Sequence, residues 1–382
     1  MTSPNLLHNP MAMPGTFKLG LFGYLHDGGN AITKAPERWR AKWDDIVAMA
    51  QQADKAGLDF IMPIARWKGI PGDINNRLHS FETLTHAAAL AGQTSRVAIF
   101  ATVHTPIIHP IVAAKSIITI DHASHGRAGL NIVCGWNQDD FDMFGFRQLP
   151  HDERYVQGTE WYEIWSRLVR GAPEPFDYDG KHYPGLKAIS GMPGAVQQPQ
   201  PIVLSAAYSS AGRDYAIKFA DYLLTVMVTR EKTGKELNEI RARAVELGRK
   251  RPLGAVGVAY VVCRKTRAEA EEFHRYYAEE MADQKGVDFY ISQRAPNAAM
   301  PEQMYRELRI RFAGGNTGFP LIGSPDDVAR GLMEMRDTGF DGAALSFLHF
   351  LDDLPMFVNE VVPRLQSVRT PKNVRAEQFA RA

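Results

Sequence analysis

The residues best suited to chemistry in this 382-residue chain lie between Gly129 and Tyr155. This stretch holds an apolar segment with one amide and one indole (LNIVCGW, 130–136), two acids at 139–140, and the sequence HDERY at 151–155. An amide, an aromatic ring and a carboxylate at the end of a buried strand, followed by Arg and Tyr on the next helix, are typical of a ligand site. They are not typical of a layer of the core.

A second segment has the features of a phosphate site. The strand-like run 202–206 breaks into small residues and leads into a helix at Ser209-Ser210. Free backbone N–H groups, two hydroxyls and the positive end of a helix dipole suit a phosphate dianion. An ordinary serine N-cap explains the same pattern. Arg154 and Tyr155 favour the phosphate interpretation if they reach the same anion, because Arg offers a fork of donors and Tyr a hydroxyl.

Two further polar residues stand at the ends of successive strand-like runs. Thr102 ends one run and Asn131 lies near the end of the next. A hydroxyl and an amide at neighbouring strand ends can hold a neutral heterocycle with alternating donors and acceptors. A structural role explains either residue alone, since threonine favours strands and asparagine commonly bonds to backbone.

Metal binding and several common catalytic motifs are not indicated. The histidines at 104, 109, 122, 125 and 349 lack the Cys/His/carboxylate spacing of zinc sites. The chain has no Gly-x-Ser-x-Gly elbow, no phosphate-loop Gly-Lys-Ser/Thr and no Gly-x-Gly-x-x-Gly after its first strand. Hydrolases, kinases and nicotinamide dehydrogenases therefore lose their strongest markers.

The elements that must position these residues alternate between strand and helix. Eight buried strands separated by helices favour a (β/α)8 TIM barrel, with a doubly wound parallel sheet as the alternative. Amphipathic patterns predict helices over 39–56, 81–91, 110–122, 153–169, 211–220, 233–247, 267–282 and 325–338, and apolar runs predict strands over 17–23, 60–64, 97–102, 129–133, 202–206, 222–227, 256–262 and 342–347.

The domain organisation follows from these elements. We expect a flexible arm over 1–16, a single barrel domain over 17–366 and a tail over 367–382. Two segments, 139–200 and 286–320, are too long for simple connections. Both are expected as insertions at the C-terminal face of the strands, where long loops commonly wall a substrate site.

Composition narrows the class of partner and the compartment. With 45% hydrophobic and 23% charged residues and a net charge of +1, the chain lacks the basic stripe that nucleic acid or an anionic membrane requires. Two cysteines make no disulfide framework, residues 1–16 do not resemble a signal peptide, and no run approaches the roughly 20 apolar residues of a membrane span. We expect a cytoplasmic protein whose partners are small molecules and copies of itself.

Beyond these patterns, the chain resembles the bacterial-luciferase-like, flavin-dependent monooxygenases. Within that family it is most similar to the branch with dimethyl sulfone and pyrimidine monooxygenases, and the resemblance covers nearly the whole chain. The motifs that carry it are NIVCGW (131–136), LPHDERY (149–155), YSSAG (208–212), LIGSP (321–325) and SFLHF (346–350).

The resemblance implies a (β/α)8 barrel that binds FMN as FMNH2 and uses O2 as co-substrate. It also implies an NAD(P)H-dependent flavin reductase as a separate, transient partner, and a homodimer or homotetramer. The substrate would be a small N-heterocycle, sulfone or sulfonate, whose oxidation can cleave a C–N or C–S bond. The alternatives are a deazaflavin-dependent oxidoreductase on the same barrel and a non-catalytic flavin-binding protein.

The resemblance also assigns roles to individual residues. Thr102 and Asn131 would line the oxygen pocket, and Trp136 would wall the flavin ring. His104 and His349 are hypothesised to tune protonation of the reacting oxygen or of the substrate, with an ordinary structural role as the alternative. FMN contacts are implied for Ala65, Arg66, Thr102, Asn131, Asp140, Arg154, Tyr155, Ser209 and Ser210.

The chain departs from these relatives at 24–30 and at 66–69. Because both segments shape the substrate side, we expect a substrate other than uracil or dimethyl sulfone. Arg66 and Lys68 would favour an anionic or acceptor-rich substrate, unless their charges are simply solvated.

Overall fold

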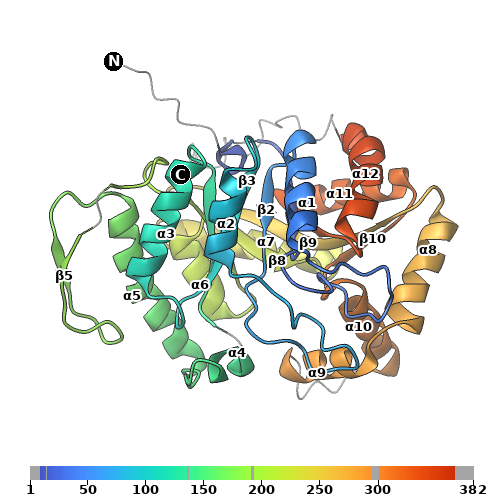
Figure 1. Ribbon diagram of the computed structural model, residues 1–382, viewed down its shortest axis with the longest axis horizontal. Coiled ribbons are helices and arrows are strands. Elements are labelled where there is room, and N and C mark those ends of the chain that lie inside the picture. The colour runs from blue at the N-terminus through green and yellow to red at the C-terminus, as the bar shows by residue number, and fades with distance from the viewer. Residues whose placement is uncertain (1–8, 14, 136, 191–192, 295–300, 366–382) are drawn as a thin grey trace.

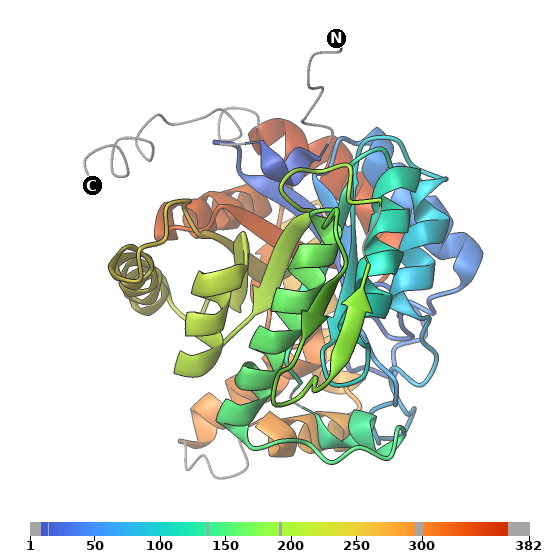
Figure 2. The same ribbon diagram turned by 90° about the vertical axis from the view of Figure 1, so that its left-hand side faces the viewer.

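Eight parallel strands close into a barrel in the computed structural model, which describes residues 9–13, 15–135, 137–190, 193–294 and 301–365 (Figures 1 and 2). The last barrel strand pairs with the first, so the sheet has no open edge there. This closure confirms the predicted (β/α)8 barrel and excludes the doubly wound sheet. In barrel order the strands are β1 (Lys18–Phe22), β2 (Phe60–Met62), β3 (Ala98–His104), β4 (Ala128–Val133), β7 (Ile202–Ala206), β8 (Tyr222–Val226), β9 (Gly254–Cys263) and β11 (Gly342–Ser346).

Helices surround the barrel and bury one face each against it. On α1, for example, Ile46, Met49 and Ala53 are spaced by three and four residues and are fully buried. None of the described helices has the length and apolar composition needed to cross a bilayer. The surrounding elements are α1 (Trp43–Lys55), α2 (Thr83–Ala91), α3 (Pro110–Ala123), α5 (His151–Val169), α6 (Ser210–Phe219), α7 (Arg230–Glu246), α8 (Arg267–Arg275) with the π-helix η2 (Tyr276–Glu280), α11 (Pro325–Thr338) and α12 (Phe350–Met356) followed by η3 (Phe357–Val361) and η4 (Val362–Leu365).

Large and small residues alternate inside the barrel. The Phe60 and Phe100 rings fill the centre, and each faces a glycine on an adjacent strand. A Cβ on Gly20 would lie 2.4 Å from the Phe60 ring, and one on Gly129 would lie 2.3 Å from the Phe100 ring. These glycines are therefore required by packing, and the interior is a filled core rather than a channel.

The floor of the barrel is closed by part of the predicted arm. Residues 10–12 form the short helix η1 (Pro10–Ala12), and Met11 is buried in the barrel's interior cluster. Tyr222 donates a hydrogen bond to the Met11 carbonyl at 2.7 Å. These residues are packed and not loose, whereas residues 1–8 and the tail from 366 lie outside the described residues and their boundaries stay predictions.

One strand of the sheet was not predicted. β10 (Phe319–Gly323) pairs in parallel with the second half of β9, from Phe319 opposite Ala259 to Gly323 opposite Cys263. Its first two residues, Phe319 and Pro320, lie within the segment 286–320 that was expected to be an insertion. Proline is tolerated here because β10 lies at the end of the sheet order.

Both long insertions contain secondary structure. The first holds all of α5, nearly all of the short helix α4 (Gln138–Asp142) and an antiparallel hairpin of β5 (Phe176–Tyr178) and β6 (Leu186–Ile189). The second holds α9 (Gln284–Arg294) and α10 (Glu302–Gly315). Figures 1 and 2 show α9 and α10 at the end of the molecule opposite η1, where α4 also lies in Figure 1. Since α4 directly follows β4, this end is the carboxyl-terminal mouth of the barrel.

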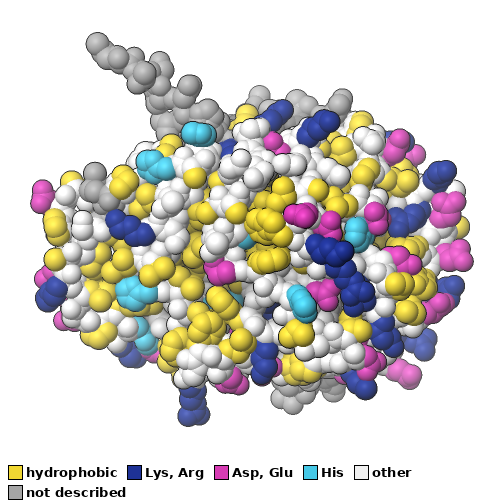
Figure 3. Space-filling model, viewed as in Figure 1, with side chains coloured by type: hydrophobic (Ala, Val, Ile, Leu, Met, Phe, Trp, Pro, Cys, Tyr) yellow, Lys and Arg dark blue, Asp and Glu magenta, His cyan; other side chains and the backbone are white. Residues whose placement is uncertain are grey.

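The face shown in Figure 3 carries basic and acidic side chains interspersed with one another. The described cysteines, Cys134 and Cys263, are both buried and free. Burial raises the pKa of the Cys134 thiol to about 12 and that of Cys263 to about 11. Both thiols are therefore neutral at physiological pH and unreactive.

Candidate functional site

Thr102 and Asn131 lie side by side at the mouth of the barrel. They are directly paired in the β3–β4 register, and each is 4% exposed. The Asn131 Nδ2 donates to Thr102 Oγ1 at 3.2 Å, and Thr102 Oγ1 donates to the Pro63 carbonyl at 2.6 Å. Asn131 Oδ1 is buried and has no hydrogen-bond partner among the described residues. The pair therefore presents a fixed amide oxygen that can accept a hydrogen bond from a ligand.

Arg66 and Asp140 form a buried ion pair beside it. Arg66 Nη1 lies 3.1 Å from Asp140 Oδ2, and both side chains are 2% exposed. Asp140 Oδ1 also accepts the backbone N–H groups of Trp67 at 3.4 Å and Lys68 at 3.1 Å. Asp140 thus fixes the end of β2 against α4. Asp140 balances the charge of Arg66, and the expectation that Arg66 favours an anionic substrate stays a prediction. Ala65, directly before Arg66, is also buried.

Trp67, which was not among the predicted site residues, holds His104 in place. The Nδ1 of His104 accepts a hydrogen bond from Trp67 Nε1 at 3.3 Å, and the Trp67 ring packs edge-on against Phe144. Burial lowers the pKa of His104 to about 4, with Arg66 lowering it further and Asp140 raising it. His104 is therefore neutral at physiological pH, with the proton on Nε2. Trp67 directly follows Arg66 in the sequence, and this was the one sequence feature that could have identified Trp67 as a site residue.

Histidines whose pKa is lowered by burial make the fold sensitive to acid, and for three of them the pKa lies near 4. Burial lowers the pKa of His86, His104 and His274 from 6.5 to about 4. Between these values the unfolded chain binds protons that the folded chain does not, so the free energy of unfolding must fall as the pH falls. We expect each histidine to contribute up to about 1.4 kcal/mol per pH unit in this window. Urea denaturation at pH 7, 6 and 5 measures the decline.

The matched variant for this experiment is His274→Phe, whose ring can still stack on Tyr260. It should make the decline between pH 7 and pH 5 shallower than in the wild type. A free energy of unfolding that is the same at pH 7 and pH 5 would contradict the prediction.

The predicted phosphate residues meet at the start of α6. Ser209 is the N-cap, and its side chain accepts the Gly212 N–H at 3.2 Å. The hydroxyls of Tyr155 and Ser209 lie 3.3 Å apart. A Cβ on Gly212 would lie 2.7 Å from the Tyr155 hydroxyl, so glycine is what lets α5 approach this helix so closely. Ser210 is the first residue of α6 and is exposed.

Arg154 is anchored next to them by backbone carbonyls. Its Nε donates to Leu149 at 3.0 Å and its Nη1 to Gly135 at 2.9 Å. Burial raises the pKa of Tyr155, while the nearby charge of Arg154 lowers it. The N-cap and the phosphate interpretations of Ser209 are compatible, because the helix start leaves other N–H groups free.

Two predicted residues are not brought into these groups. His349 precedes α12, its Nδ1 lies 3.1 Å from Asp352 Oδ2, and its ring packs edge-on against Trp39. These contacts are on the β11 side of the mouth. Trp136 lies outside the described residues.

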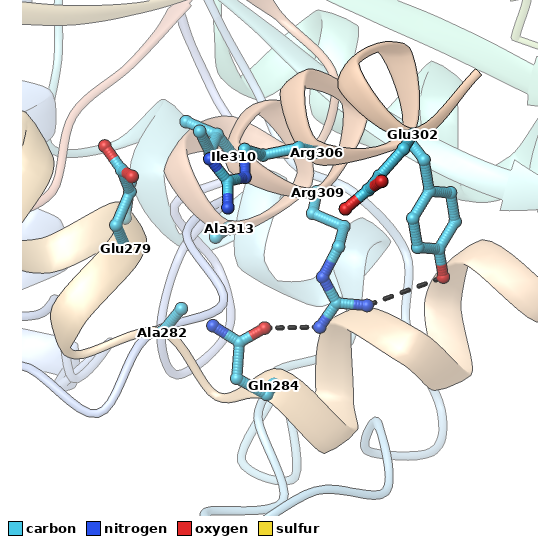
Figure 4. A pocket seen from close by; sticks show the side chains of 10 residues that line it. Glu279, Ala282, Gln284, Glu302, Arg306, Arg309, Ile310 and Ala313 are labelled. Atoms are coloured by element: carbon cyan, nitrogen blue, oxygen red, sulfur yellow. Dashed lines mark hydrogen bonds between the residues drawn. The ribbon is translucent and has the colours of Figure 1, made fainter.

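A hollow of about 450 Å³ lies between η2, α9 and α10 (Figure 4). Figure 4 shows Arg309 hydrogen-bonded to Gln284 at its edge. Arg309 Nη1 also donates to the Tyr305 hydroxyl at 3.5 Å. None of the predicted site residues lines this hollow, which is therefore separate from the groups around Asn131 and Ser209.

Comparison with known proteins covers most of the chain. Residues 21–342 match the family described as luciferase-like monooxygenases. The chain is 27% identical over 351 residues to an FMNH2-dependent dimethylsulfone monooxygenase from Pseudomonas putida, covering 89% of this chain and 93% of that protein. It is 25% identical over 364 residues to the pyrimidine monooxygenase RutA from Acinetobacter baylyi, covering 92% and 95%.

Among solved structures, the fold is similar to that of DmoA from Hyphomicrobium sulfonivorans. The TM-score is 0.80 at 18% sequence identity, over 94% of this chain and 90% of that one. At this identity the likeness concerns the fold alone.

Proposed function

The chain belongs to the luciferase-like monooxygenase family, and from this premise we propose that it is the oxygenase component of a two-component system. It would take FMNH2 and O2 and oxidise a small organic substrate of the N-heterocycle, sulfone or sulfonate class. The observation that carries this proposal is the placement of two groups on the adjacent strands β4 and β7. Asn131 presents its amide oxygen from β4, and Ser209 starts the helix that follows β7.

The residues present fit FMN. The start of α6, the Ser209 hydroxyl, the Ser210 N–H, Tyr155 and Arg154 offer hydrogen bonds and positive charge to a phosphate dianion. Asn131 Oδ1, which lacks a partner among the described residues, would accept a hydrogen bond from the ring system. Ala65, Thr102 and the Arg66–Asp140 pair would complete the ring side. When bound, the reduced flavin supplies the electrons for the reaction with O2.

In this proposal the chain's own residues position the reacting groups and exclude water from them. Thr102 holds the Asn131 amide in one orientation through the hydrogen bond between them. Asp140 fixes the backbone of Trp67 and Lys68, and Trp67 in turn holds His104. Because His104 is neutral and its Nδ1 is engaged, only its Nε2–H is left to donate toward a reacting group. Whether His349 has a similar role stays a hypothesis.

Reduced flavin would come from a separate NAD(P)H-dependent reductase that binds transiently, and the chain would act as a homodimer or homotetramer in the cytoplasm. The name of the Pseudomonas putida relative, an FMNH2-dependent enzyme, supports delivery of flavin in its reduced form.

The function is tested by product formation under 18O2 with FMN, NADH and a generic flavin reductase. The panel would include uracil, dimethyl sulfone, short sulfonates and simple N-heterocycles, analysed by mass spectrometry. A product with one 18O supports the monooxygenase. Tight binding of FMNH2 with no labelled product from any compound would leave a substrate outside this panel or the non-catalytic flavin-binding alternative.

Asn131→Ala is expected to leave FMN affinity largely intact and to lower the product formed per O2 consumed. Removing one oriented hydrogen bond at a reacting centre costs about a hundredfold in rate. The control is Ser205→Ala on the neighbouring strand, whose hydroxyl donates to the Ile132 carbonyl instead. Oxygen-electrode traces and product yields measure the ratio. An unchanged ratio in Asn131→Ala would remove this residue from the oxygen pocket.

A further inference from the structure

Two loops at the mouth of the barrel are joined into one wall. They follow β1 and β2 and are connected by backbone hydrogen bonds. The Asp27 N–H donates to the His79 carbonyl at 2.8 Å, and the Phe81 N–H donates to the Leu25 carbonyl at 3.3 Å. His26 is paired with Ser80 in the same short ladder. The side chains on this wall are therefore held in place by backbone.

Three polar side chains in this wall are completely buried but incompletely bonded. His26, Asn30 and Asn76 are at most 1% exposed. Both amide atoms of Asn30 and the Oδ1 of Asn76 have no hydrogen-bond partner among the described residues, and neither ring nitrogen of His26 makes a well-aligned hydrogen bond there. Native proteins satisfy nearly all buried polar atoms, so several such atoms in one wall indicate that a partner from outside the chain completes them.

The chemistry of that partner follows from a count of donors and acceptors. Burial, together with the charges of Arg77 and Arg66, holds the pKa of His26 well below its ordinary value, although backbone hydrogen bonds to Asp27 and to His26 itself raise it, so the ring is neutral. Its N–H faces these carbonyls, and its other nitrogen is an acceptor. Asn30 offers its NH2 group as a donor and its oxygen as an acceptor. Asn76 already donates to the Ala31 carbonyl at 2.6 Å, which fixes its free atom as the oxygen acceptor.

Three of these atoms are thus acceptors: the second ring nitrogen of His26 and the oxygens of Asn30 and Asn76. A sulfone, a sulfonate or a carboxylate only accepts hydrogen bonds and would leave these three unsatisfied. A neutral group with both N–H and C=O can satisfy both kinds of atom. Exchanging the oxygen and nitrogen of Asn30 does not alter the count, because both of its atoms lack partners.

Strained backbone on both sides of Asn76 fixes the position of its side chain. Asn75 and Arg77 both have left-handed backbone, with φ of 46° and 65°. A Cβ on Gly28 would lie 1.9 Å from Asn76 Oδ1, so the opposite loop needs a glycine at this point. Such strain is retained chiefly at functional sites. Arg77, which donates to the Tyr290 hydroxyl at 3.0 Å, secures the loop to α9.

The position of this wall in the barrel also fits a role in substrate binding. In the closed order of strands, β1 lies four strands from β7 in either direction, so the wall faces the predicted phosphate residues across the mouth. Building on the proposed function, we propose that His26, Asn30 and Asn76 bind the substrate, and that the substrate carries a neutral amide, imide or N–H heterocycle group. This selects one substrate class out of the three that the family resemblance leaves open.

The test is binding of small probes to the full-length protein loaded with FMN, measured by calorimetry. Uracil and succinimide present N–H and C=O groups, whereas dimethyl sulfone and methanesulfonate only accept. We expect uracil and succinimide to bind about tenfold or more tightly than the other two, since each unmet buried group weakens binding. Asn30→Leu, similar in shape, should remove this preference.

The matched control is Thr33→Val in the same loop, because the Thr33 hydroxyl already bonds to the Tyr277 and Met281 carbonyls. It should keep the preference. Equal binding of all four probes, or a preference that survives in Asn30→Leu, would overturn the proposal and leave these atoms to ordered water. If Asn30→Leu does not fold by circular dichroism, the wild-type preference alone decides. FMN affinity is titrated separately, so loss of flavin binding would count against the proposed function and not against the wall.

Discussion

Asp140→Asn is expected to lower the free energy of unfolding by about 3–5 kcal/mol, the scale measured when one partner of a buried ion pair is removed. Arg66 and Asp140 lie 3.1 Å apart and are each 2% exposed. The asparagine oxygen could still accept the N–H groups of Trp67 and Lys68. The variant therefore removes the negative charge and leaves the buried guanidinium uncompensated. Urea denaturation at pH 7 measures the loss.

Asp139 supplies the control for this variant. It is the preceding residue, also lies in the first turn of α4, and is only half-buried. Asp139→Asn should change the free energy of unfolding by no more than about 0.5 kcal/mol. If the two variants are equally stable, the ion pair contributes nothing to the fold, and the fixed position of the β2 end must have another cause.

The double variant Arg154→Ala/Ser209→Ala is expected to weaken FMNH2 binding by about 10²- to 10⁴-fold. Hydrogen bonds to a charged group contribute about 1.5–3 kcal/mol each, and two of them are removed. Anaerobic titration followed by flavin fluorescence measures the affinity. The comparison variant is Arg147→Ala, an exposed arginine close to the start of α5.

Arg147→Ala removes the same charge outside the predicted phosphate site and should bind FMNH2 within about threefold of the wild type, as expected for a screened surface charge. If the double variant binds as tightly as Arg147→Ala, the phosphate is held elsewhere. Loss of the Ser209 cap also costs about 1 kcal/mol of helix stability, so the fold of the double variant must be verified by circular dichroism.

The parts of this structure that were predictable from sequence are those set by local periodicity. The pairing of Thr102 with Asn131 follows from two successive strands that end in a polar residue, because parallel strands place their carboxyl ends together. The contact of Tyr155 with Ser209 follows from the order of the elements, because α5 and the end of β7 are neighbours in the same barrel. β10 was missed because Pro320 hides a strand that depends on β9 for its pairing.

The buried polar wall could not be predicted for a different reason. His26, Asn30 and Asn76 occur in glycine-rich loops whose sequences are typical of exposed turns. Their burial arises from the pairing of two loops that are about fifty residues apart in the chain, and no local pattern encodes it. The ion pair of Arg66 with Asp140 could not be predicted for the same reason, because Arg66 follows β2 and Asp140 follows β4.

The length of β9 gives the two sides of the mouth different mechanical properties. β9 pairs with β8 along its first half and with β10 along its second, and α10 leads almost directly into β10. Any outward swing of α10 must therefore break backbone hydrogen bonds of the central sheet. On the opposite side, α4 and the segment after it pair with no strand, and Phe144 and Phe146 are 37% and 45% exposed. The pairing of β9 with β10 thus ties α10 to the central sheet, whereas beside α4 the exposed rings of Phe144 and Phe146 leave an apolar surface at the mouth.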